Sequence, residues 1–311
     1  MIRVLPTTKK PSSRHSARIR RVLLEKVEQA ISRLRGAGVA SPEADAWHLA
    51  VFATGVSRGE LQARAVRGDV MLTDDEAQVF DAGLSRRVAR EPLWHITGRA
   101  PFLQFELVVG PGVFTPRPET ELLTEQARTE AQLMPPRDGV VRVVDLCAGS
   151  GAIGLALAAD IPHLDVLLVE KSPEAAAYLQ TNRTAIAPVN TEILQGEVGQ
   201  AVTHRAPGSV DVVVSNPPYL VEGADELDVE THGHDPHEAL FASDGGLAVI
   251  REVVEVSAQL LRDGGVVFIE HGIDQSEAVQ SLLTTQGFAR AETIVDLVGR
   301  PRFTRAERAR R

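Results

Sequence analysis

The spacing of apolar residues predicts a helical segment between residues 20 and 90. Apolar side chains recur there at three- and four-residue steps, the spacing of helices that bury one face. Proline follows serine at Ser41-Pro42, and a capping box spans Thr73–Glu76, so two of these helices have clear starts. No cluster of catalytic side chains is evident in this part of the sequence. We therefore predict a small helical bundle that serves substrate recognition.

A different pattern begins at Glu91-Pro92, where the helical spacing ends. Phe102, Phe105 and Leu107 then follow the alternation of short strands, with glycines and prolines between them. We predict a β-hairpin linker over residues 91–117.

Strands alternate with helices from residue 118 to residue 311, which is the pattern of a sheet covered by helices on both faces. The predicted strands cover residues 140–146, 165–170, 191–195, 210–215, 265–270, 291–297 and 301–304. We therefore predict an α/β domain of the Rossmann-like kind, with a seven-stranded, mostly parallel sheet.

Composition narrows the class of protein. The chain has 311 residues, of which 43% are hydrophobic and 24% charged, as in globular proteins. We find no apolar run near the ~20 residues of a membrane helix. The formal charge of −9 argues against a broad nucleic-acid surface. Cys147 is the single cysteine, which excludes an internal disulfide and fits a reducing compartment.

The first residues are basic and contain no acid before Glu25. Arginine and serine without acids are typical of organelle-targeting peptides, so a mitochondrial location stays open. We favour a disordered or over-extended start over residues 1–19, because no apolar face accompanies the arginines before Ile19. The expected location is then the bacterial cytoplasm.

The quartet Asn216–Tyr219 (Asn-Pro-Pro-Tyr) is the first candidate site. It follows a β-branched run at Val210–Ser215 that predicts a buried strand. Each proline restricts the residue before it to extended conformations and lacks an N–H group. The quartet is therefore a stiff segment at the carboxyl end of a strand, where ligands bind in open α/β sheets. An ordinary strand-to-loop turn is the alternative for an isolated Asn-Pro pair.

A second candidate is the small-residue loop after the strand at 140–146. Gly149 and Gly151 allow the backbone to approach a ligand closely. We see no Gly-Lys-Ser/Thr here, which excludes a phosphate-binding P-loop, and the dinucleotide pattern G-x-G-x-x-G is matched only in part.

Two acids favour S-adenosylmethionine over NAD as the cofactor. Asp145 lies in the strand before the loop, where its carboxylate can accept from a cationic amino group. Glu170 ends the next strand, where an acid can bind both ribose hydroxyls. Combined with Asn216–Tyr219 at a third strand end, they predict a methyltransferase.

The set of motifs resembles the protein-(glutamine-N5) methyltransferases, the PrmC/HemK family. The matching segments are Glu91–Gly98, Pro116–Glu121, the glycine loop, Ser215–Tyr219, Asp235–Leu240 and Ile269–Gly272. The resemblance implies a class I methyltransferase fold and transfer of a methyl group from S-adenosylmethionine to the glutamine of the GGQ motif in class I peptide release factors. It also implies a set of cofactor-binding residues: Asp145, Cys147, Ala148, Gly149, Ser150, Gly151, Glu170, Glu197, Val198 and Asn216.

The same resemblance implies how the glutamine is bound. Asn216 Oδ1 and the Pro217 carbonyl would accept from the two N–H bonds, and Tyr219 would pack on the amide plane, with loop-to-core packing as the alternative. These residues and Pro218 form the expected substrate-binding and catalytic set. Three positions depart from the family pattern: Cys147 at the first loop position, Glu170 where aspartate is usual, and Val198 where many members have an aromatic residue.

Two other functions remain open. An exocyclic amine of adenine or guanine in nucleic acid could use the same quartet, although residues 41–81 contain more acids than bases. A catalytically silent cofactor-binding adaptor is the third possibility. We expect a monomer with release factors as partners, no direct nucleic-acid contact and no membrane. We expect no metal at His232, His234 and His237, because they lie in a loop without a paired ligand cluster.

Overall fold

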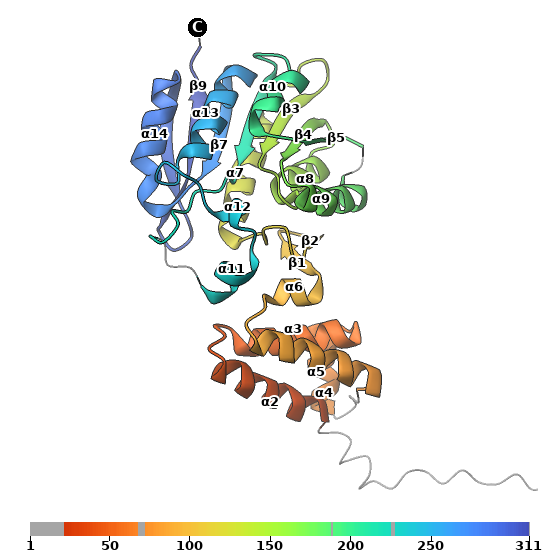
Figure 1. Cartoon of the computed structure of the whole chain (residues 1–311). Helices are drawn as coiled ribbons and strands as arrows, with labels where there is room; N and C mark the ends of the chain where they lie inside the picture. Colours follow the sequence, from red (N-terminus) through yellow and green to blue (C-terminus); the bar gives the residue numbers. More distant parts are fainter. Residues whose placement is uncertain (1–21, 68–71, 188, 225–227, 311) are drawn as a thin grey trace, which may run out of the picture. The chain divides into compact units, whose positions relative to one another are not determined.

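The computed structural model describes residues 22–67, 72–187, 189–224 and 228–310 (Figure 1). The predicted basic extension at residues 1–19 lies outside the described residues. Contacts divide the chain into two compact units, Met1–Thr97 and Gly98–Arg311. Within the described ranges, the structure contains no helix that is long and apolar enough to cross a membrane.

The first unit is a helical bundle. Its helices are α2 (Val22–Gly36), α3 (Pro42–Thr54), α4 (Arg58–Arg67), α5 (Asp74–Val88) and α6 (Leu93–Thr97). The capping box predicted at Thr73–Glu76 starts α5, since the Thr73 hydroxyl and the Glu76 carboxylate each accept from the other's backbone N–H. A buried ion pair between Arg87 and Asp45, 2.7 Å long, joins α5 to α3.

The stretch predicted as a hairpin linker contains two kinds of structure. Strands β1 (Arg99–Phe102) and β2 (Phe105–Val108) pair in antiparallel fashion. The prediction missed α6, which belongs to the first unit. Leu93 and Ile96 lie three residues apart on one face of α6 and are buried in the core of the bundle. Pro92 precedes the helix and its carbonyl accepts from Ile96 N–H, so this proline starts a helical turn instead of breaking one.

The second unit contains a seven-stranded sheet of order β5-β4-β3-β6-β7-β9-β8, which confirms the predicted fold class. The pairings from β5 to β7 are parallel, and β9 runs antiparallel to both β7 and β8. The strands are β3 (Val141–Leu146), β4 (Leu164–Glu170), β5 (Thr191–Gln195), β6 (Val210–Ser215), β7 (Leu261–Glu270), β8 (Phe288–Val295) and β9 (Pro301–Arg308).

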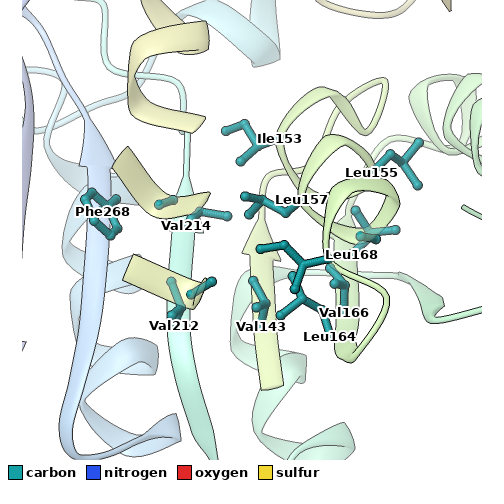
Figure 2. Close-up of a cluster of buried hydrophobic side chains, with 14 of the residues drawn as sticks. Val143, Ile153, Leu155, Leu157, Leu164, Val166, Leu168, Val212, Val214 and Phe268 are labelled. Atoms are coloured by element: carbon teal, nitrogen blue, oxygen red, sulfur yellow. The ribbon is translucent and has the colours of Figure 1, made fainter. Parts of the chain in front are cut away.

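Two hydrophobic cores cover the two faces of this sheet, because successive strand residues point to opposite sides. Val143 and Val212 belong to the core under α7 (Pro118–Leu133), α8 (Ala152–Asp160) and α9 (Pro173–Ile186), part of which Figure 2 shows. Val144 and Val213 belong to the other core, under α10 (Ala201–His204), α13 (Ala248–Leu260) and α14 (Ser276–Thr285). The buried sheet therefore fixes the strand ends on which the site is built.

Short elements occupy the connections near the carboxyl ends of the strands. They are the 3-10 helices η1 (Val198–Gln200) and η2 (Ile273–Gln275), and the helices α11 (Val229–His234) and α12 (His237–Leu240).

Candidate active site

A cavity of about 1070 Å³ lies in the second unit, at the carboxyl ends of β3, β4, β6 and β7. All of its lining residues lie between Gly112 and Arg302. The predicted site residues that line it are Cys147, Ala148, Gly149, Ser150, Glu170, Glu197, Val198, Asn216, Pro217, Pro218 and Tyr219. Sequence positions up to 72 residues apart are thus brought to one end of the sheet, as expected of an open α/β fold.

The glycine loop follows β3 and has left-handed backbone conformations at three positions. Cys147, Gly149 and Gly151 have φ angles of 63°, 57° and 87°. A Cβ atom on Gly151 would lie 2.5 Å from Leu179 Cδ1 and 2.6 Å from Leu155 Cδ1, so only glycine fits. A Cβ atom on Gly149 would meet no atom within 4 Å. The loop therefore packs tightly against the helices at Gly151 and leaves open space at Gly149.

Glu170 ties this loop to the end of β4. Its carboxylate accepts from the backbone N–H of Gly149 and from that of Ser172, both at 2.7 Å. Burial raises the pKa of Glu170, although the backbone N–H groups oppose the rise. Each carboxylate oxygen has further acceptor capacity, so Glu170 can still bind a hydroxyl group in the cavity that it lines.

Two predicted cofactor residues, Gly151 and Asp145, do not line the cavity. Asp145 is 1% exposed. Its Oδ2 accepts from Gly154 N–H at 2.8 Å, which holds the first turn of α8. The expected contact between Asp145 and a cationic amino group stays a prediction.

Asp145 is buried and Cys147 is partly buried, and burial changes the protonation of both. Burial raises the pKa of Asp145 to about 7, with the Gly154 hydrogen bond opposing the rise. Burial also raises the pKa of the Cys147 thiol well above its usual range. A neutral thiol is a poor nucleophile, so we expect no covalent role for Cys147.

Glu197 and Val198 lie on opposite sides of the turn that begins η1. The Glu197 carboxylate is exposed and lies 3.2 Å from Lys171 Nζ. Val198 is buried against the core beneath α13. Val198 therefore gives the cavity an aliphatic wall at the position where many members of the PrmC/HemK family have an aromatic residue.

The Asn-Pro-Pro-Tyr quartet is held at each end by side chains from other elements. The Ser215 hydroxyl donates to the Leu146 carbonyl at 2.7 Å, which joins the end of β6 to the end of β3. Asn216 Nδ2 donates to Thr120 Oγ1 at 3.1 Å. The Tyr219 hydroxyl donates to Glu270 Oε1 at 3.3 Å. Tyr219 also packs against the core under α13, so the predicted alternative of core packing describes part of its contacts.

Sequence reasoning assigned no role to Thr120 and Glu270, although both lie in segments that carried the resemblance. Glu270 is 3% exposed and accepts from the Thr120 hydroxyl at 2.8 Å as well as from Tyr219. Burial raises the pKa of Glu270 to about 7. An acid at the carboxyl end of a buried strand was the available signal, and the same signal singled out Glu170.

A contact between two segments that line the cavity was also missed. Arg117 Nη2 lies 2.6 Å from Asp235 Oδ2 and donates to Thr231 Oγ1 at 3.0 Å. The Arg117 guanidinium also lies over the Phe114 ring, 5.1 Å from its centroid. The contacts of Arg117 with Asp235 and Thr231 join the segment before α7 to the segment that carries α11 and α12. Burial raises the pKa of Asp235 to about 6, although Arg117 opposes the rise.

The histidines of this region form no metal-ligand cluster. In the described ranges, no group of three or more His, Cys, Asp or Glu residues could hold a metal ion. His237 pairs with Glu222 at 3.3 Å and stacks on Phe241. His271 is buried, its Nε2 lies 2.9 Å from Thr304 Oγ1, and burial lowers its pKa.

Comparisons with known proteins match both units of the chain. Residues 25–98 match the model of the PrmC N-terminal domain, and residues 120–262 match that of the methyltransferase small domain. A solved T. thermophilus 16S rRNA N2 G1207 methyltransferase in complex with AdoMet and guanosine is 28% identical, with a TM-score of 0.47, covering 68% of this chain and 50% of that one.

Curated relatives match over nearly the whole chain. The release factor glutamine methyltransferase of Mycolicibacterium smegmatis is 44% identical over 92% of this chain and 97% of its own length. That of Escherichia coli is 36% identical over 89% of this chain and 96% of its own length. With the quartet and the glycine loop at one cavity, this similarity shows that the chain belongs to the release factor glutamine methyltransferase family.

Proposed function

We propose that this protein transfers a methyl group from S-adenosylmethionine to the side-chain N5 of the glutamine in the GGQ motif of class I peptide release factors. The observation that carries the proposal is the orientation of Asn216. Its Nδ2 is directed to Thr120 Oγ1, so its Oδ1 remains to accept from a ligand in the cavity. An acceptor beside a stiff Pro-Pro backbone suits a planar N–H₂ group.

The residues around the cavity fit S-adenosylmethionine. Its volume of about 1070 Å³ exceeds that of most small-molecule pockets, which leaves room for a cofactor and a substrate side chain. The open space at Gly149 allows close approach of a ligand to the backbone, and Glu170 offers acceptors for ribose hydroxyls. Val198 supplies an apolar surface for the adenine ring. When bound, the cofactor supplies a methyl group on a positively charged sulfur.

The chain's own residues align the glutamine. An amide nitrogen is a weak nucleophile, because its lone pair is delocalised into the carbonyl. Asn216 Oδ1 and the Pro217 carbonyl accept from the two N–H bonds and so fix the direction of that lone pair. The bound cofactor would supply the methyl group and keep the C–S electron pair on its sulfur, and one N5 proton would leave to water. Holding the two reacting atoms at ~3–3.5 Å is a large source of rate without a general base.

The finer assignments belong to the same proposal. We assign substrate recognition to residues 20–90, connection to residues 91–117 and catalysis to residues 118–311, with a monomer in the bacterial cytoplasm as the acting form. The two compact units and the match of the first unit to the PrmC N-terminal domain support this division. The net charge of −9 supports a protein substrate over a nucleic acid.

Competing methyl acceptors test the proposal. The full chain and labelled S-adenosylmethionine are incubated separately with a class I release factor, with double-stranded DNA and with ribosomal RNA. We expect label in the release factor alone. Label in DNA or RNA, with none in the release factor, would replace the proposed substrate with an exocyclic base amine. Cofactor binding by calorimetry without label in any acceptor would instead indicate a catalytically silent adaptor.

A further inference from the structure

A chain of hydrogen bonds runs from the end of β7 to the catalytic quartet. The Glu270 carboxylate accepts from Thr120 Oγ1 at 2.8 Å through Oε2. Thr120 Oγ1 in turn accepts from Asn216 Nδ2 at 3.1 Å. Both Glu270 and Thr120 are 3% exposed, so water does not readily replace either partner. The three side chains come from β7, α7 and the loop after β6.

The Thr120 hydroxyl determines which group donates and which accepts in these hydrogen bonds. A hydroxyl has one proton, and an ionised carboxylate can only accept. While Glu270 is ionised, the proton of Thr120 is committed to it, and Thr120 can only accept from Asn216. The amide group of Asn216 is then forced to direct Nδ2 to Thr120 and Oδ1 away from it. A reversed amide would present N–H₂ to the N–H₂ of glutamine, and two donors cannot pair.

The other end of the quartet depends on the same carboxylate. Glu270 Oε1 accepts from the Tyr219 hydroxyl at 3.3 Å. The pKa of the Tyr219 phenol is raised above its usual range by burial and by Glu270, so the phenol stays a donor. The Tyr219 carbonyl accepts from Gln275 Nε2 at 2.9 Å, which fixes the backbone at this point. One carboxylate thus orients the first and the last side chain of the quartet.

We propose that Glu270 is a positioning residue that acts through Thr120 to set the amide orientation of Asn216 for glutamine recognition. This inference rests on the proposed function and adds a specificity element to the same site. Glu270 acts through two other side chains and needs no contact with the reacting atoms.

We call the hydrogen bonds from Glu270 through Thr120 to Asn216 the relay. The charged surroundings of Glu270 make this relay dependent on pH. Tyr219 from the loop after β6, Glu119 from α7 and Arg302 from β9 face it; Arg302 favours the ionised form and Glu119 opposes it. Burial is the largest influence and raises the pKa to about 7. Protonation gives Glu270 an O–H donor, so the proton of Thr120 is no longer committed to it and the Asn216 amide is no longer held in one orientation. The relay is therefore complete above pH ~7 and is lost as the pH falls below it.

Three variants of the full-length chain test the relay. Glu270→Gln keeps the shape and removes the charge, Thr120→Val keeps the shape and removes the hydroxyl, and Thr120→Ser restores a hydroxyl. We expect the first two to lower kcat for release factor methylation roughly ten- to hundredfold, because a buried polar partner is left unsatisfied or reversed. Thr120→Ser should recover most of the loss. Cofactor affinity, measured by calorimetry, should change by less than about threefold, since these side chains act on the substrate side.

The double variant Thr120→Val/Glu270→Gln distinguishes a relay from two separate structural effects. When two residues act through the same series of hydrogen bonds, their losses of kcat are not additive. The double variant should therefore be about as slow as the slower single variant. The matched control is Thr124→Val, a buried threonine one turn further along α7 whose hydroxyl donates to the Thr120 backbone carbonyl. We expect this control to keep kcat within about twofold of the parent chain.

The pH profile supplies a readout that a structural role would not move. In the parent chain kcat should fall as the pH is lowered through ~7, and in Glu270→Gln the profile should be flatter across that range. Losses that multiply in the double variant, or a Glu270→Gln chain with unchanged kcat and pH profile, would overturn the inference. If the parent chain does not methylate a release factor at all, the proposed function fails, which is a different result.

Discussion

Three buried carboxylates surround the cavity, and each holds a different part of its wall. Asp145 holds the first turn of α8, and Glu170 holds the glycine loop. Glu270 holds Thr120 and Tyr219 beside the quartet. Burial raises the pKa of all three, so the protonation of these acceptors becomes sensitive to pH nearer neutrality than that of an exposed carboxylate.

Stability should therefore depend on pH near neutrality. Asp145 has a pKa of about 7 in the folded chain and 3.8 as its ordinary value, so the folded state binds a proton that the unfolded chain has released between pH ~4 and ~7. Its contribution to the free energy of unfolding is present below pH ~4 and is lost as the pH rises to ~7. Urea unfolding at several pH values should show a shallower decline for Asp145→Asn. The exposed Glu255→Gln is the control, and an equal slope for both variants would contradict the prediction.

Gly151 in the glycine loop and Gly139 before β3 can be compared for the stability that a side chain costs. Their φ angles are 87° and 83°, but a Cβ atom meets Leu179 and Leu155 only at Gly151. Alanine at Gly139 should cost about 1 kcal/mol from backbone strain alone. Gly151→Ala should cost about 2–4 kcal/mol, because steric overlap is added. Equal midpoints of urea unfolding for the two variants would show that the loop relaxes.

Positions at the cavity were predictable where the backbone pattern decides them. Gly149 and Asn216–Tyr219 line the cavity, and glycine and proline restrict the backbone whatever surrounds them. The burial of Asp145 away from the cavity lining was not predictable from its position in the strand. The relay through Thr120 joins positions 96 and 150 residues apart, and sequence spacing carries no such contact.

At the scale of elements, two segments far apart in sequence close one side of the cavity. Arg117 precedes α7, and its partners Asp235 and Thr231 lie in the α11–α12 segment 114–118 residues later. The Asp235 side chain is 2% exposed and the Arg117 side chain 35% exposed, so the ion pair is buried on its carboxylate side. Breaking a buried pair is far more costly than breaking one at the surface.

Removing this ion pair should loosen the α11–α12 segment. In Arg117→Ala the buried Asp235 carboxylate loses its cation, and we expect about 2–4 kcal/mol less stability for this segment. Hydrogen exchange should be faster for residues 228–241 and little changed in β3 and β6. The control is Arg251→Ala, whose pair with Asp244 is about half exposed on both sides. Similar exchange in the two variants would mean that the Arg117–Asp235 ion pair does not stabilise the α11–α12 segment.

Elements of the sheet were predictable in kind, and their ends were not. The strand predicted at 265–270 begins at Leu261, and the final strand extends from Pro301 to Arg308. The start of β7 at Leu261 lies opposite Val210 of β6, and the end of β9 pairs with β7 and β8, so pairing between distant segments decides both extensions. Helix α6 was missed for the same reason, because burial of Leu93 and Ile96 in the bundle stabilises only one turn and a little more.

At the scale of the whole molecule, the chain has two compact units with separate cores. The first has a hydrophobic core of its own, and the two cores of the second belong to the sheet. The cavity is lined from the second unit alone. Cofactor binding and methyl transfer should thus depend on residues 98–311, and recognition of a folded release factor on both units.

A chain that starts at Gly98 tests this division. Its affinity for S-adenosylmethionine, measured by calorimetry, should stay within about threefold of the full chain. Its kcat/KM should fall more than about tenfold on a folded release factor and much less on a short GGQ peptide, because a peptide offers little surface for recognition. Equal losses on both substrates would contradict a recognition role for the first unit.

We infer that the quartet presents acceptors to a glutamine side chain. Mass spectrometry of the GGQ peptide, after incubation of a release factor with the full chain and S-adenosylmethionine, tests this inference. We predict one added methyl group on the glutamine, and at least a tenfold lower rate of its formation with Asn216→Ala, which lacks the acceptor. An unmodified glutamine, or methylation at the same rate by Asn216→Ala, would contradict the proposed function.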